Sequence, residues 1–247
     1  MSGTAVVLVT GGTRGVGLGV VRAFVKAGAL VVTCGRSEVD AEVPYLRVDV
    51  RDPSQVDTLV SAIVDEYGRL DVVVNNAGGA PPVPAATASP RLHQKVVELN
   101  LLAPLHVSQR ANAVMQQQDS GGAIVMIGSV SGTRPSPGTA AYGAAKAGLA
   151  NLATSLAVEW APKVRVNTVV VGPVDTELSH LHYGDETGVA AVGSTIPMGR
   201  MATPADVAEA CLFLASPAAA YITGSTLTVH GGGERPAFLD ASNAEVE

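Results

Sequence analysis

The feature that most constrains this fold is a glycine-rich turn between the first two predicted elements. Residues 5–10 form a short, continuous apolar run rich in β-branched residues, which is typical of a strand buried on both faces. Residues 10–17 read TGGTRGVG and lead directly into a helical pattern over residues 16–27. Glycines let the backbone approach a phosphate closely, and a helix N-terminus presents unbonded N–H groups to it. The segment therefore predicts the start of a βαβ unit that binds a dinucleotide.

Strand and helix patterns alternate along the rest of the chain. The predicted strands are residues 29–34, 46–48, 71–75, 123–127, 164–170 and 225–229, and the predicted helices are residues 53–67, 89–117, 139–161 and 203–215. Alternation of this kind indicates parallel strands joined by crossover helices. We therefore predict one α/β domain over residues 1–247, a doubly wound Rossmann-type sheet of about seven parallel strands with helices on both faces.

Three segments interrupt this alternation. Residues 36–46 leave little room for a crossover helix and predict a short loop. Residues 172–202 have a weak pattern with several glycines, and they predict a substrate loop because a loop this long in a compact domain is usually functional. Residues 231–247 exceed what the last strand needs and are expected to form a C-terminal tail.

Composition and charge exclude several classes of protein. The net charge is −6 and no cluster of Lys and Arg is present, so a nucleic acid is not expected as a partner. The apolar runs are far shorter than a membrane span, and the first four residues lack the basic start of a secretory signal. Cys34 and Cys211 make no disulfide framework. The sequence predicts a cytoplasmic enzyme with no membrane or metal partner.

The end of the second predicted strand indicates which dinucleotide is bound. Proteins specific for NAD place an acidic residue there to hold the ribose 2′-hydroxyl, but here no acid occurs before Glu38. Arg36 and Arg14 instead supply cations that can bind a 2′-phosphate. The alternative is that both arginines are ordinary surface residues. The pattern favours NADP(H) as cofactor, with NAD(H) possible.

A tyrosine and a lysine point to acid–base chemistry. Tyr142 and Lys146 lie four residues apart, so they share one face of the predicted helix. A protonated lysine beside a tyrosine stabilises the phenolate and lowers the tyrosine pKa. Ser129 follows the preceding strand, at the sheet edge where ligands bind. Alone the pair is weak evidence, because a half-buried tyrosine and a solvated lysine at this spacing occur often by chance.

The order and spacing of several motifs resemble the short-chain dehydrogenase/reductase family over almost the whole chain. The matching residues are Thr10-Gly-x-x-x-Gly-x-Gly17, Val48-Asp49-Val50, Asn75-Asn76-Ala77-Gly78, Asn100, Ser129, Tyr142-x-x-x-Lys146, Asn167 and Gly172-x-Val174-x-Thr176. One departure is the order Val171-Gly172-Pro173, since the family usually has Pro-Gly at this point.

The resemblance implies roles for the matched residues. Tyr142 would exchange a proton with the substrate oxygen, Ser129 would orient that oxygen, and Asn100 would fix a water in a proton relay. Lys146 would hold the nicotinamide ribose and lower the Tyr142 pKa. The expected cofactor-binding residues are Gly11, Thr13, Arg14, Gly15, Val16, Arg36, Ser37, Asp49, Val50, Asn76, Ala77, Tyr142, Lys146, Val174 and Thr176. The enzyme would interconvert a carbonyl and a secondary alcohol by hydride transfer.

The expected substrate pocket is mostly apolar. Its predicted lining is Gly79, Ala80, Val130, Ser131, Val174, Leu178, Leu181, His182 and Tyr183. Relatives that reduce carrier-bound thioesters usually have basic residues before the fifth strand, where this chain has the sequence QQQDS over residues 116–120. These observations favour a small apolar carbonyl or alcohol over a 3-oxoacyl thioester. His180 and His182 lack the further ligands of a metal site.

Other functions and assemblies stay open at this point. A non-catalytic NADP(H)-binding redox sensor would need the phosphate cradle but not the tyrosine. An epimerase or dehydratase would usually carry a larger C-terminal domain than this chain has room for. Small residues along the helix predicted at residues 139–161 leave a smooth second face, which favours a homo-oligomer, a dimer or tetramer. The C-terminal tail would fold onto a neighbouring subunit or stay mobile.

Overall fold

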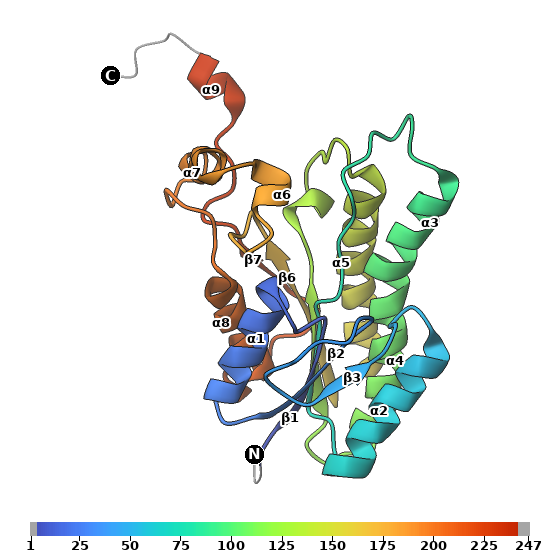
Figure 1. Cartoon of the computed structure of the whole chain (residues 1–247). Helices are drawn as coiled ribbons and strands as arrows, with labels where there is room; N and C mark the ends of the chain where they lie inside the picture. The colour runs from blue at the N-terminus through green and yellow to red at the C-terminus, as the bar shows by residue number, and fades with distance from the viewer. Residues whose placement is uncertain (1–3, 242–247) are drawn as a thin grey trace.

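The computed structural model describes residues 4–241, and its centre is a seven-stranded parallel sheet (Figure 1). The strand order is β3-β2-β1-β4-β5-β6-β7. The strands are β1 Val6–Thr10, β2 Leu30–Gly35, β3 Tyr45–Arg47, β4 Val72–Asn75, β5 Gly122–Ile127, β6 Val164–Val171 and β7 Thr226–Val229. The predicted strands and their parallel pairing are confirmed, with ends that differ by one residue.

Helices cover both faces of the sheet. They are α1 Gly15–Lys26, α2 Pro53–Tyr67, α3 Pro90–Val97, α4 Ala103–Met115, α5 Ala140–Trp160, α6 His180–Tyr183, α7 Glu186–Ser194, α8 Pro204–Ala215 and α9 Ala237–Ala241. On one face α2, α4 and α5 bury residues such as Ile63, Met115 and Leu149 against the sheet. On the other face α1 and α8 bury Phe24 and Leu214. Each fully buried side chain of this kind stabilises the fold by about 1.5–3 kcal/mol.

The long helix predicted over residues 89–117 is divided in the structure. A five-residue π-helix, Glu98–Leu102, separates α3 from α4. Pro104 stands at the start of α4 and has no N–H to donate, so the regular α-helical pattern cannot pass through it. The π-helix turns Asn100 inward, where its side chain is fully buried.

Two connections bear on the site. Residues 36–44 join β2 to β3 without a helix, as predicted. The segment 172–202 is not a plain loop, because it contains α6 and α7. The Asp185 side chain caps α7 by accepting hydrogen bonds from the N–H groups of Thr187 and Gly188, a local signal that the weak apolar periodicity concealed.

The site-bearing segments lie at one edge of the sheet. The carboxyl ends of β1, β4, β5 and β6 face the N-terminus of α1 and the segment that holds α6 and α7. β1 begins at the opposite end of the molecule, and α9 projects away from the body (Figure 1). Across residues 4–241, no helix is both long and apolar enough to cross a membrane.

Candidate active site

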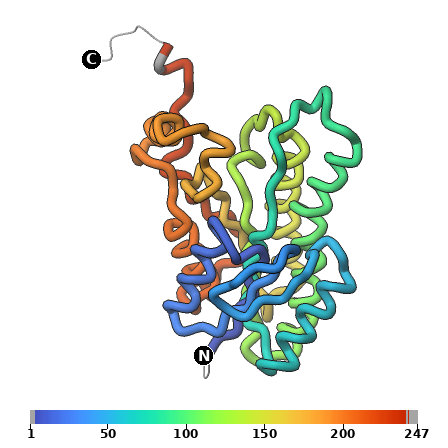
Figure 2. Tube along the Cα trace, viewed as in Figure 1, coloured from blue at the N-terminus to red at the C-terminus, as the bar shows by residue number. Residues whose placement is uncertain are grey.

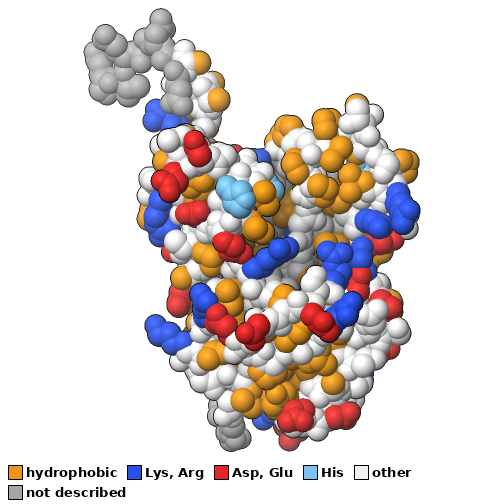
Figure 3. Space-filling view, viewed as in Figure 1, with side chains coloured by type: hydrophobic (Ala, Val, Ile, Leu, Met, Phe, Trp, Pro, Cys, Tyr) orange, Lys and Arg blue, Asp and Glu red, His pale blue; other side chains and the backbone are white. Residues whose placement is uncertain are grey.

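Two adjoining clefts open at the carboxyl edge of the sheet, where Figure 3 shows the molecule hollowed. The glycine-turn cleft has a volume of about 520 Å³ and the tyrosine cleft about 550 Å³. Val16, Asn76, Gly78 and His182 line both, so the two clefts form one continuous site. The expected cofactor residues Tyr142, Lys146 and Val174 line the tyrosine cleft. The other twelve line the glycine-turn cleft: Gly11, Thr13, Arg14, Gly15, Val16, Arg36, Ser37, Asp49, Val50, Asn76, Ala77 and Thr176.

The glycine turn is held by close backbone contacts. A Cβ on Gly17 would lie 2.2 Å from the Gly11 carbonyl oxygen and 2.4 Å from Asn76 Nδ2, so no larger residue fits there. The Asn76 amide donates to the carbonyls of Thr10 and Gly11, each at 3.0 Å. Buried Thr33 accepts from the Gly12 N–H at 2.8 Å and donates to the Val9 carbonyl at 2.7 Å. Neighbouring strands thus hold the turn in a single shape.

An intramolecular carboxylate lies at the N-terminus of α1. The Gly15 N–H donates to Glu177 Oε1 at 3.0 Å, although the two residues are 162 positions apart. Figure 2 shows the segment around Glu177 beside the start of α1. The carboxylate stands in for an anionic group such as a phosphate, because a helix N-terminus binds either one through the same N–H groups. The glycine turn therefore fits the pyrophosphate of a dinucleotide.

Three arginines border the adenosine side of the glycine-turn cleft. Arg14 and Arg36 are exposed and line the cleft. Arg47, which the sequence analysis missed, lines an adjoining hollow with Arg36 and donates from Nε to the Arg36 carbonyl at 3.1 Å. The parallel pairing of β2 with β3 brings Arg47 opposite Gly35. That pairing was the missing signal, since eleven positions separate the two arginines.

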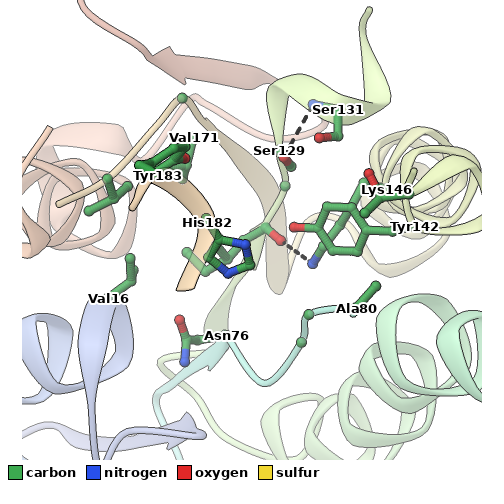
Figure 4. A pocket seen from close by; sticks show the side chains of 17 residues that line it. Val16, Asn76, Ala80, Ser129, Ser131, Tyr142, Lys146, Val171, His182 and Tyr183 are labelled. Atoms are coloured by element: carbon green, nitrogen blue, oxygen red, sulfur yellow. Dashed lines mark hydrogen bonds between the residues drawn. The ribbon is translucent and has the colours of Figure 1, made fainter. Parts of the chain in front are cut away.

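Ser129, Tyr142 and Lys146 come together in the tyrosine cleft (Figure 4). Lys146 is buried and donates from Nζ to the Ile127 carbonyl at 2.7 Å, and its Nζ lies 5.7 Å from the centre of the Tyr142 ring. Burial lowers the pKa of Lys146 to about 8. Burial also raises the pKa of Tyr142, and the neighbouring Ser129 hydroxyl partly offsets that rise. The lowering of the Tyr142 pKa by Lys146 stays a prediction, because the shift in this structure arises from burial, Ser129 and Tyr183.

The side chains of Asn100 and Asn167 form hydrogen bonds with the backbone around the site. Asn100 accepts from the Gly79 N–H and donates to the carbonyls of Gly79 and Val96, each at 2.9 Å. Both amide N–H groups of Asn100 are thereby used on the backbone. The expected role of Asn100 in fixing a water of a proton relay stays a prediction. Asn167 accepts from the Ser225 N–H and donates to the Ile222 carbonyl, which positions β7 rather than the site.

Comparison with known proteins identifies the family. A family model described as enoyl-(acyl carrier protein) reductase matches residues 11–234. The 3-oxoacyl-[acyl-carrier-protein] reductase of Vibrio cholerae is 36% identical, covering 92% of this chain and 96% of its own. The 3alpha-hydroxysteroid dehydrogenase of Mediterraneibacter gnavus is 35% identical over 92% and 95% of the two chains. The ligand-free aldohexose dehydrogenase of Thermoplasma acidophilum superposes with a TM-score of 0.89, at 30% identity over 99% and 97%.

This chain is a short-chain dehydrogenase/reductase. It is therefore an enzyme of a family that uses NAD(P)(H) in general.

The substrate side of this dehydrogenase differs in part from the sequence expectation. Gly79, Ala80, Ser131, Val174, His182 and Tyr183 line the tyrosine cleft as predicted. Leu178 lies in the glycine-turn cleft, Leu181 is 62% exposed, and Val130 lines neither cleft. These three apolar residues are therefore lost from the expected pocket, while Thr139 adds a hydroxyl group. Among residues 4–241 no group of His, Cys, Asp or Glu could hold a metal.

Replacing Glu177 with glutamine is expected to strengthen cofactor binding. The carboxylate lies on the N–H group offered to the pyrophosphate, and a neutral amide competes less and does not repel a phosphate. We expect Glu177→Gln to lower the dissociation constant of NADP⁺ by about two- to fivefold in a calorimetric titration. Glu186→Gln, which changes an exposed carboxylate on α7, is the control. Unchanged or weaker binding in Glu177→Gln would contradict this prediction.

The lowered pKa of Lys146 predicts a pH effect on stability. Between pH 8 and pH 10.5 the unfolded chain keeps this proton while the folded protein releases it, so stability rises with pH across this window. Lys146→Met removes the effect. The free energy of unfolding of the wild type, minus that of the variant, should increase by up to about 3 kcal/mol from pH 7.5 to pH 10. Urea denaturation measures it, and exposed Lys95→Met should show no such slope.

Proposed function

We propose that this dehydrogenase interconverts a carbonyl and a secondary alcohol with NADP(H), using Tyr142 as acid and base. The observation that supports this most is the meeting of Ser129, Tyr142 and Lys146 in a cleft continuous with the glycine turn. A bound nicotinamide supplies or accepts the hydride. The Tyr142 hydroxyl gives a proton to the substrate oxygen during reduction and takes it back during oxidation. Ser129 holds the same oxygen by hydrogen bonding, and Lys146 holds the nicotinamide ribose.

The proposed preference for NADP(H) rests on charge. Arg14, Arg36 and Arg47 border the adenosine side, and charge-assisted hydrogen bonds from guanidinium groups suit a 2′-phosphate. The nearest carboxylate in the lining, Asp49, is paired with Arg51, which lowers the pKa of that carboxyl. Binding of NAD(H) stays possible because the rest of the glycine-turn cleft suits either dinucleotide.

The second candidate function is reduction of a 3-oxoacyl thioester. The description of the matching family model and the name of the Vibrio cholerae relative favour it. The sequence argument against it was the absence of basic residues at positions 116–120. This segment leads into the amino end of β5, opposite the active site, so its composition carries no information about the substrate.

We also propose a homo-oligomer assembled through α5, with a cytoplasmic location as predicted from the sequence. Ala144, Ala147, Asn151, Thr154 and Val158 are exposed at helical spacing along one side of α5, and Val158 is 82% exposed. Small side chains let a second helix approach closely. None of these five side chains is charged, so burying them in an interface requires no desolvation of an ionic group.

Cofactor titration tests the charge argument. We expect NADPH to bind the wild type more tightly than NADH, and Arg36→Ala to weaken NADPH binding by about tenfold or more, as for loss of a hydrogen bond between charged groups. Binding of NADH should change by less than about twofold. Arg91→Ala, an exposed arginine on α3, is the control. Equal affinity of the wild type for both cofactors would refute the preference for NADP(H).

Turnover of Tyr142→Phe tests the acid–base role. With a ketone and NADPH, kcat/KM should fall by about 10²–10⁴, because the variant has no proton to give. The variant should still bind NADPH, since its ring and backbone are unchanged. Tyr221→Phe changes a fully exposed hydroxyl and should behave like the wild type. Turnover of Tyr142→Phe at the wild-type rate would refute the acid–base role of Tyr142.

A further inference from the structure

The wall of the tyrosine cleft beyond Ser129 is built from hydroxyl groups. Ser131 and Thr139 line the cleft, and Ser136 connects them from behind. Ser136 Oγ donates to Ser131 Oγ at 3.1 Å and lies 2.6 Å from Thr139 Oγ1. The Ser131 N–H also donates to Ser129 Oγ at 3.2 Å, so this row begins beside the oxygen that would hold the reacting group (Figure 4).

The hydroxyl groups of Ser131, Ser136 and Thr139 leave one hydrogen-bond donor free for a ligand in the cleft. Each hydroxyl has one proton and two lone pairs. Ser136 gives its proton to Ser131, so Thr139 supplies the proton shared between Thr139 and Ser136. No acceptor for the Ser131 proton is found within residues 4–241. A ligand hydroxyl beside Ser131 can therefore accept one hydrogen bond, and it can donate another to the free lone pair of Thr139.

The same cleft provides little for an anion or a long apolar chain. Within residues 4–241 the only Lys or Arg of its lining is Lys146, with one ammonium proton bonded to the Ile127 carbonyl and the others assigned to the nicotinamide ribose by the proposed function. The adjoining apolar corner, lined by residues such as Pro81, Val83 and Leu92, has a free volume of about 20 Å³. A single water molecule needs about 10–15 Å³ of such volume, so the corner has room for about one water and for no extended acyl chain. A phosphate, a carboxylate or an extended acyl chain therefore finds no matching subsite there.

We propose that the substrate is a small, uncharged carbonyl compound with a hydroxyl on the carbon next to the reacting one, and that Ser131 and Thr139 bind this hydroxyl. This inference rests on the proposed function. In the oxidative direction a vicinal diol would give a hydride from one carbon to the oxidised nicotinamide, and the proton of that carbon's hydroxyl to the Tyr142 phenolate, which becomes the phenol. The product is an α-hydroxy ketone, and reduction reverses both transfers. The hydroxyl row adds a polar subsite to a cleft that keeps apolar residues such as Ala80 and Val174.

Two ketones that differ by a single hydroxyl test this proposal. We compare kcat/KM for 3-hydroxybutan-2-one and butan-2-one with NADPH, in the wild type, Ser131→Ala and Thr139→Val. The wild type should prefer the hydroxylated ketone by about tenfold or more. Each substitution should reduce the ratio of the two kcat/KM values by about three- to tenfold, as expected for loss of one hydrogen bond. Comparing this ratio between the wild type and each variant cancels the different intrinsic reactivity of the two ketones.

A matched control and two further substrates separate the possible failures. Ser120→Ala changes an exposed hydroxyl at the opposite edge of the sheet and should keep the wild-type ratio. An unchanged ratio in both cleft variants would overturn the assignment of Ser131 and Thr139. Faster turnover of decan-2-one or an acetoacetyl thioester than of 3-hydroxybutan-2-one would overturn the substrate class and leave the proposed function standing. Absence of turnover with every carbonyl would overturn the proposed function itself, and this inference with it.

Discussion

Gly17 packs directly against the backbone of Gly11, and the cofactor side of the enzyme depends on this contact. A single methyl group at Gly17 would overlap the Gly11 carbonyl, so α1 begins against the turn with its N-terminus toward the carboxyl edge of the sheet. The contact is supported from two sides, because Asn76 follows β4 and Thr33 lies in β2. The pairing of Val9 with Thr33 and Val74 places these supports beside the end of β1. Glu177 adds a competing anion from a remote segment.

Burial sets the electrostatics of the catalytic cleft. It disfavours charge on either partner, so it raises the Tyr142 pKa and lowers that of Lys146. The cost of burying Lys146 is offset in part by one strong hydrogen bond to the Ile127 carbonyl, at the point where β5 ends. A phenolate beside this ammonium would shift both pKa values in the opposite direction, as for any coupled pair. The cleft thus favours the protonated form of Tyr142 and places the Lys146 Nζ 5.7 Å from the centre of its ring.

Much of this structure could be predicted from local patterns. The alternation of strands and helices and the glycine-rich turn before α1 follow from patterns that act within a few residues. The prediction failed where a local signal was overridden or hidden. Pro104 divides a continuous helical pattern, and the cap at Asp185 starts a helix in a segment without apolar periodicity. Arg47 stayed unnoticed because its place beside Arg36 depends on strand pairing.

The sequence by itself therefore determined the class of fold, the phosphate-binding turn and the residues that carry the proposed chemistry. It did so because glycine conformation, helix capping and side-chain chemistry are properties of short segments. The tertiary structure alone decided the electrostatics and the shape of the site. Burial raises the Tyr142 pKa, and the fold of residues 131–139 brings the hydroxyl groups of Ser131, Ser136 and Thr139 together. Both results depend on which distant groups exclude water, and no local pattern records that.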